Sequence, residues 1–157
     1  MHPKTDSMYG GTNAATPFQI LLVEDQDAHA MVIERATGRL EQPLDMRRAR
    51  DGAEAIDCLR RPGEPLPQLI LLDLKLPKVT GLDVLRTIKS DPDLLAIPVV
   101  VLTTSVSEHD RSEAFRLHAN AYVQKPDTYE GFRNVIRTIA GFWVSCNVPP
   151  TGLGMTG

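Results

Sequence analysis

The stretch LILLDLKLP, residues 69–77, decides the fold of this 157-residue chain, because its opening apolar run ends at Asp73. Three other short, largely apolar runs also end at polar residues: ILLV at Glu24-Asp25, PVVVL at Thr103 and AYVQ at Lys125. Such runs, alternating with helical patterns, are typical of strands buried on both faces of a parallel sheet. Reactive groups lie beyond the carboxyl ends of such strands, so we expect these side chains to face one crevice.

A fifth strand is expected at residues 44–49, where two arginines favour a position at the sheet edge. The clearest helical periodicity involves His29, Val32, Ile33 and Ala36. We expect His29 to pack at the edge of this helix and not to bind metal. The last helix, about 127–145, carries an apolar stripe wider than one sheet contact requires.

Five strands alternating with five helices and joined by right-handed crossovers predict an α/β fold. It is a doubly wound, five-stranded parallel sheet of flavodoxin-like order 2-1-3-4-5. The length and the 42% hydrophobic content suit one domain, expected at residues 18–145. We expect a flexible leader at residues 1–17 and a flexible Pro/Gly-rich tail at 146–157.

Charge and hydropathy exclude several classes of function. Seventeen basic and twenty acidic residues give a net charge of -3, which offers no support for binding nucleic acid or a membrane surface. No stretch approaches the roughly 20 apolar residues that span a bilayer, and the first residues lack the apolar core of a signal peptide. A cytoplasmic protein is therefore expected, with Cys58 and Cys146 as free thiols.

Three carboxylates, from Glu24, Asp25 and Asp73, are expected to crowd one site. Like charges raise one another's pKa values, and a divalent cation resolves that conflict. Mg²⁺ prefers oxygen ligands and keeps several waters. Asp25 and Asp73 fit as direct ligands, and Glu24 fits as a ligand through water.

With a metal bound, Asp73 has the features of a nucleophile towards phosphorus, forming an aspartyl phosphate. Lys125 would then neutralise the transferred phosphoryl oxygens, and Thr103 would hydrogen-bond them. The sequence thus predicts a phosphoryl-accepting site at the carboxyl edge of the sheet.

Over residues 18–145 the chain resembles the receiver domain of two-component response regulators. The resemblance rests on the acidic pair Glu24-Asp25, on Asp73 in the phrase LLDLKLP with Gly81 following, on Thr103, and on Lys125-Pro126. Thr103 lies 30 residues past Asp73, and Lys125 lies 22 past Thr103, which matches the spacing of the family.

The resemblance implies that Asp73 accepts a phosphoryl group from a phosphohistidine on a sensor histidine kinase. It implies that the Lys75 backbone carbonyl joins the acidic residues at the Mg²⁺ site. Thr103 and Lys125 would sense the phosphoryl group, and Tyr122 would swing inward when Thr103 moves. The bond between Lys125 and Pro126 would be cis. The chain would be a switch and not an enzyme, beyond self-phosphorylation and autodephosphorylation.

Within that family the chain looks most like the small single-domain regulators of phytochrome histidine kinases. The signals are the phrase VVVLTTS at 99–105, the long stretch between Asp25 and Asp73, the Pro-rich loop before the third strand, and GFW at 141–143. That subgroup implies a homodimer through the fourth helix, fifth strand and fifth helix. Lys75 departs from the shorter polar residue often found there, and its effect on the phosphoryl lifetime stays open.

Three other functions compete with this interpretation. A phosphohydrolase of the haloacid-dehalogenase type needs a general acid two residues after its nucleophile, where this chain has Lys75. A nucleotide- or flavin-binding module needs a Gly-rich first loop, and the acidic loop at 24–27 would repel phosphate. A degenerate receiver that docks partners without phosphorylation remains the alternative, although all five site positions are filled.

Overall fold

The computed structural model describes residues 16–149. Its strands are β1 (Phe18–Val23), β2 (Leu44–Ala49), β3 (Leu69–Leu72), β4 (Val99–Thr103) and β5 (Ala121–Gln124). Its helices are α1 (Asp27–Thr37), α2 (Gly52–Arg60), α3 (Gly81–Ser90), α4 (Glu108–Arg116), α5 (Tyr129–Ala140) and a short π-helix, η1 (Gly141–Cys146). Within these described residues, no helix combines the length and apolar character needed to cross a membrane.

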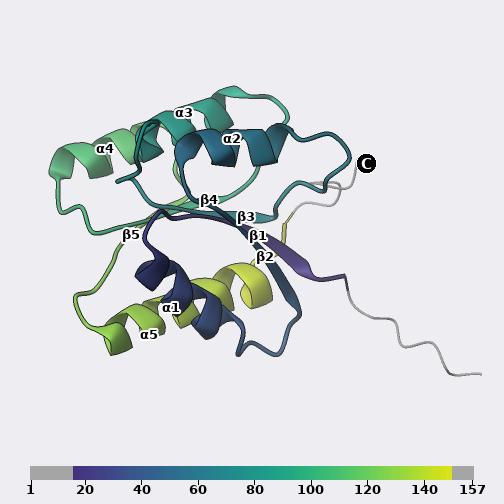
Figure 1. Ribbon diagram of the computed structural model, residues 1–157, viewed down its shortest axis with the longest axis vertical. Helices are drawn as coiled ribbons and strands as arrows, with labels where there is room; N and C mark the ends of the chain where they lie inside the picture. Colours follow the sequence, from purple (N-terminus) through teal and green to yellow (C-terminus); the bar gives the residue numbers. More distant parts are fainter. Residues whose placement is uncertain (1–15, 150–157) are drawn as a thin grey trace, which may run out of the picture.

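The five strands form one parallel sheet in the order β2-β1-β3-β4-β5. Figure 1 shows α2, α3 and α4 on one face of the sheet and α1 and α5 on the other. The predicted doubly wound topology is therefore confirmed, as is the placement of the arginine-bearing strand β2 at an edge.

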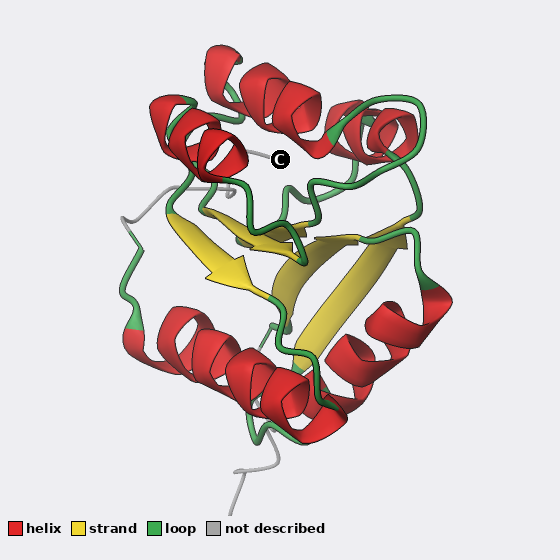
Figure 2. Ribbon diagram, turned by 90° about the vertical axis from the view of Figure 1, so that its left-hand side faces the viewer, coloured by secondary structure: helices red, strands yellow, loops and turns green. Residues whose placement is uncertain are grey.

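Figure 2 shows the sheet between its two helical layers. One apolar core lies on each face of the sheet. Side chains alternate along a strand, so Leu21 and Val23 of β1 enter one core while Ile20 and Leu22 enter the other. Strand β3 has apolar residues at every position because both of its faces are covered. This explains why its sequence has no polar alternation.

The chain after α5 differs from the single helix expected to reach residue 145. The α-helix ends at Ala140, and the next six residues form η1. The backbone N–H of Asn147 donates to the Phe142 carbonyl 2.7 Å away, the i to i+5 spacing of a π-turn. Trp143 thereby packs, half-buried, against the core beneath β1. Most of the predicted leader and tail lies outside the described residues.

One local prediction for the second half of the chain is wrong. No peptide bond among residues 16–149 is cis, so Lys125–Pro126 adopts the trans form, which ordinarily lies about 0.5–1 kcal/mol lower for X–Pro bonds. Nearby, the Ser107 side chain caps α4 by accepting from the Asp110 N–H, and the Asp110 carboxylate accepts from the Ser105 hydroxyl at 2.6 Å.

Candidate functional site

The polar residues that follow the strands are held in place by continuation of the strand ladders. The backbone N–H of Glu24 donates to Ala49 O at 3.0 Å, and that of Asp73 donates to Val23 O at 3.0 Å. The Lys125 N–H donates to the Thr103 carbonyl at 2.7 Å. Parallel pairing thus brings four strand ends to one edge of the sheet, as the sequence predicts.

Gly81 lets the chain return close beneath the strand end that carries Asp73. Its N–H donates to Leu74 O at 3.0 Å, which draws the start of α3 against this segment. A Cβ at position 81 would lie 2.3 Å from Asp73 O and 2.5 Å from Leu74 Cα. Only glycine allows this approach, so Gly81 fixes the backbone that presents the Asp73 carboxylate.

Glu24, Asp25 and Asp73 form the carboxylate cluster. One oxygen from each carboxylate lies within 4.8 Å of the others. Glu24 and Asp73 are almost fully buried, and Asp25 Oδ1 is a buried oxygen without a hydrogen-bond partner in the part of the chain that the structure describes. A buried acceptor without a partner carries a desolvation cost that a cation offsets. The cluster therefore fits a hard divalent metal ion with oxygen ligands.

Lys125 is the buried cation of the site, with 3% of its surface exposed. Its ammonium donates to Glu24 Oε2 at 2.7 Å and to Asp73 Oδ2 at 3.0 Å. Burial raises the pKa of Glu24 above its ordinary value, and the ion pair with Lys125 opposes that rise. One ammonium facing three carboxylates leaves the site with an excess of negative charge.

Lys75 lies beside the cluster through its backbone. Its N–H donates to Asp73 Oδ1 at 3.1 Å, so both Asp73 oxygens have a donor. The Lys75 side chain is exposed to solvent. A phosphohydrolase of the haloacid-dehalogenase type needs a carboxyl group at position 75 as its general acid, and Lys75 provides none.

Thr103 and Tyr122 meet the loop between β4 and α4. Thr103 is fully buried, and its Oγ1 accepts from the Ser105 N–H at 3.2 Å, which leaves its hydroxyl proton available for another acceptor. The half-buried Tyr122 hydroxyl donates to Ser105 O at 3.3 Å, and burial raises the pKa of this phenol. Both residues therefore contact Ser105, at the start of the loop that leads to α4.

His29 belongs to the site, although its helical periodicity predicts only a position at the edge of the helix. Its Nδ1 lies 2.9 Å from Lys125 Nζ and 3.8 Å from Glu24 Oε1. Burial and the neighbouring ammonium hold the pKa of His29 below its ordinary value. A signal was present in the sequence, because His29 falls in the first turn of the helix that directly follows β1, at the same edge of the sheet as Asp73.

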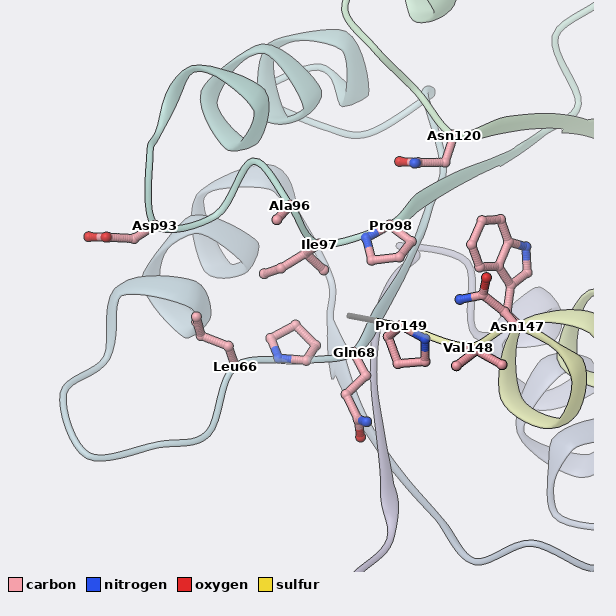
Figure 3. A pocket seen from close by; sticks show the side chains of 12 residues that line it. Leu66, Gln68, Asp93, Ala96, Ile97, Pro98, Asn120, Asn147, Val148 and Pro149 are labelled. Carbon is pink, nitrogen blue, oxygen red and sulfur yellow. The ribbon is translucent and has the colours of Figure 1, made fainter. Parts of the chain in front are cut away.

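A separate pocket of about 330 Å³ lies at the opposite end of the sheet (Figure 3). Gln68, Pro98 and Asn120, which directly precede β3, β4 and β5, form part of its wall. Trp143 and Pro149 close it from the C-terminal side. Among the described residues that line it, Asp93 is the one carboxylate and there is no histidine or cysteine. This pocket and the ionisable cluster lie at opposite ends of the strands.

The sequence of this chain is similar to those of known regulatory proteins. A family model described as the response regulator receiver domain matches residues 20–137. The probable methanogenesis regulatory protein FilR2 of Methanothrix harundinacea is 46% identical over 140 residues, which cover 87% of this chain and 90% of FilR2. The response regulator Rcp1 of Synechocystis is 41% identical over 134 residues, covering 82% of this chain and 90% of Rcp1.

Solved structures agree with the sequence comparisons. The phosphorylated cyanobacterial phytochrome response regulator RcpA is similar with a TM-score of 0.83 and 41% identity, covering 87% of this chain and all of RcpA (100%). The Mn²⁺-bound form of Rcp1 gives a TM-score of 0.82 and 38% identity, covering 85% of this chain and 99% of Rcp1. Fold, carboxylate cluster and family match together show that the chain belongs to the response regulator receiver domain family.

Proposed function

We propose that this receiver is a stand-alone phosphorylation switch in which Asp73 accepts a phosphoryl group from a phosphohistidine of a sensor histidine kinase. One observation carries the proposal. The buried Asp73 carboxylate lies 3.0 Å from the buried Lys125 ammonium and shares a metal-sized cluster with Glu24 and Asp25. Such a carboxylate is close both to a cation and to a metal site.

The transfer is a displacement at phosphorus. An oxygen of the Asp73 carboxylate attacks the phosphorus, and the new O–P bond forms as the N–P bond to the kinase histidine breaks. The electron pair of the broken bond returns to the imidazole nitrogen. Lys125 offers an ammonium to the phosphoryl oxygens, and Thr103 offers its hydroxyl proton.

Mg²⁺, when bound, would neutralise charge on the phosphoryl oxygens during transfer. Asp25 and Asp73 are proposed as direct ligands, Glu24 as a ligand through water, and the Lys75 backbone carbonyl as a further ligand. The unpartnered Asp25 Oδ1 and the oxygen-only donor set support this assignment over a soft transition metal.

Phosphorylation is proposed to alter the loop between β4 and α4. Movement of Thr103 towards the phosphoryl group would break its bond from Ser105, and Tyr122 would move inward with that loop. Helix α4 has one buried residue, Ala114, so little apolar packing holds it in a single position. Phosphorylation would thus change the protein-protein contacts made on the α4 side of the molecule.

The proposal includes two partners: a phytochrome as the sensor kinase and a second copy of this chain. The similarity to the phytochrome response regulator RcpA supports a phytochrome as the sensor kinase. A homodimer through α4, β5 and α5 is supported by the half-exposed Phe115, whose ring lies 6.4 Å from that of Tyr122. An exposed phenylalanine packed beside a half-buried tyrosine is suited to a protein interface.

The decisive experiment measures the intact mass of the protein after incubation with acetyl phosphate and Mg²⁺. We expect one phosphoryl addition, which is absent when the metal is chelated and absent in Asp73→Asn. The exposed Asp93→Asn variant is the matched control, because that carboxylate lies at the other end of the sheet. It should be phosphorylated like the original chain.

A degenerate receiver, which docks partners without phosphorylation, would show no phosphoryl addition in this experiment. No mass addition, together with no Mg²⁺-dependent binding of beryllofluoride, would exclude phosphoryl acceptance and leave a docking domain. Addition that persists in Asp73→Asn would place the acceptor elsewhere.

The dimer is tested by light scattering with and without beryllofluoride. Phe115→Ser should lower the dimer fraction severalfold, since Phe115 is 51% exposed on α4. Leu95→Ser, which changes a residue 48% exposed outside the proposed interface, should leave it unchanged. Equal effects of both substitutions would argue against the α4–β5–α5 face.

A further inference from the structure

The Lys125 ammonium has three N–H donors and three partners. Two are the carboxylates of Glu24 and Asp73, and the third is Nδ1 of His29 at 2.9 Å. An ammonium has no acceptor capacity, so in this contact His29 must accept through the Nδ1 lone pair. The contacts to the two carboxylate oxygens, 2.7 and 3.0 Å long, are those of an ammonium that donates to both.

The imidazole of His29 is also held from its other side. Its ring packs edge-on against Phe132 of α5, with centroids 5.5 Å apart and an interplanar angle of 80°. The neighbouring Ala30 and Ile33 are buried and fix α1 against the sheet. The acceptor atom is therefore presented by a ring whose orientation is restrained by packing.

We propose that His29 is a positioning residue that holds the Lys125 ammonium at the phosphoacceptor site. This inference rests on the proposed function of Asp73. The two carboxylates that bind Lys125 belong to the cluster that would also bind metal and phosphoryl group, so their oxygens are shared. His29 lies outside that cluster and keeps its lone pair for Lys125. Lys125 thus retains a fixed partner while its other two partners change.

The test compares two substitutions that differ in one acceptor atom. In His29→Asn, Oδ1 is attached to Cγ as Nδ1 is in histidine, so an acceptor remains close to its place. In His29→Leu, a branched apolar side chain replaces it and can still pack against Phe132. We expect His29→Leu to weaken Mg²⁺-dependent beryllofluoride binding and slow phosphorylation by acetyl phosphate, each about tenfold. His29→Asn should stay within about threefold of the original protein.

Met31→Ala on the exposed side of the same helix is the control for general effects on α1, and thermal unfolding checks the fold of each variant. Leucine and asparagine variants that both behave like the original chain would overturn the proposal. So would equal losses in the two variants, because they would assign the effect to the ring and not to its acceptor.

A second measurement does not depend on phosphorylation. In ¹⁵N NMR spectra of the metal-free protein at about pH 8, above the ordinary pKa of histidine, His29 should carry its proton on Nε2. Its Nδ1 resonance should show an accepted hydrogen bond that disappears in Lys125→Met. A proton on Nδ1, or a resonance that Lys125→Met leaves unchanged, would refute the contact. A protein that shows the contact but never binds beryllofluoride would refute the proposed function instead.

Discussion

Glu24 is a buried carboxylate whose raised pKa makes the stability of the fold depend on pH. Its side chain is 1% exposed, and burial raises its pKa above 4.5 although Lys125 opposes the shift. A raised pKa means that the folded protein binds the Glu24 proton more tightly than the unfolded chain does. The free energy of unfolding therefore falls as the pH rises from 4.5 through the folded-state pKa.

Replacing Glu24 with glutamine removes this linkage. In metal-free solution at neutral pH, Glu24→Gln should raise the free energy of unfolding and should weaken Mg²⁺ binding. Urea denaturation at about pH 4.5 and about pH 8 measures the effect, which should shrink at the lower pH. A variant whose stability depends on pH as steeply as that of the original chain would contradict the assignment to Glu24.

At the scale of single residues, the sequence predicts the site residues that lie at strand ends but does not predict that His29, on a helix, belongs to the site. Glu24, Asp73 and Lys125 directly follow strands and Thr103 ends one, so parallel pairing leaves these residues no other edge to occupy. His29 lies on a helix, where a half-buried side chain can turn towards the sheet edge or away from it. Periodicity gives the face of a helix but not the direction of a polar side chain at its border.

At the scale of the elements, the turn between β3 and α3 leaves no room for a side chain at position 81. Gly81→Ala would put a Cβ 2.3 Å from Asp73 O, against backbone that cannot yield cheaply. We expect a loss of about 3 kcal/mol in the free energy of unfolding, together with slower phosphorylation at Asp73.

Gly141→Ala provides the matched control. This residue has a helical φ of -59°, and a Cβ there meets no described atom within 4 Å beyond its chain neighbours and the backbone of its own helix. Alanine should stabilise the fold by about 0.5–1 kcal/mol, because it lowers the entropy of the unfolded chain and favours helix. Chemical denaturation compares both variants, and similar effects at the two glycines would contradict the steric account.

The strands follow from the sequence, whereas the end of the last helix does not. The runs at 69–72 and 121–124 coincide with β3 and β5, and the run at 98–102 gives β4 within a residue. The change from α5 to η1 at Gly141 depends on the tertiary packing of Trp143 and on an i to i+5 bond. The apolar stripe continues unbroken through that change, so periodicity alone predicts one long helix.

For the molecule as a whole, metal binding and folding are expected to be linked through the carboxylate cluster. A ligand that binds the folded state alone stabilises it by about 2.7 kcal/mol at one hundred times its dissociation constant. For a domain of this size that corresponds to a rise in Tm of roughly 5–10 °C. Thermal unfolding with Mg²⁺ and with a chelator measures this rise.

Asp25→Asn should abolish most of that rise, because it removes the charge of a proposed direct ligand. Its metal-free stability should change little, since Asp25 Oδ1 has no protein partner to lose among the described residues. A Tm rise of equal size in the variant would place the metal away from this cluster.

The bond from Lys125 to Glu24 joins residues 101 positions apart in the chain. During synthesis the three carboxylates leave the ribosome long before their ammonium does, and contacts of such separation form late in folding. A chain that ends before β5 has Asp73, the proposed phosphoacceptor, without the lysine that neutralises it. Under the proposed function, the capacity to accept a phosphoryl group therefore arises only after β5 has joined the sheet, so a phosphorylated copy is also one whose sheet is complete.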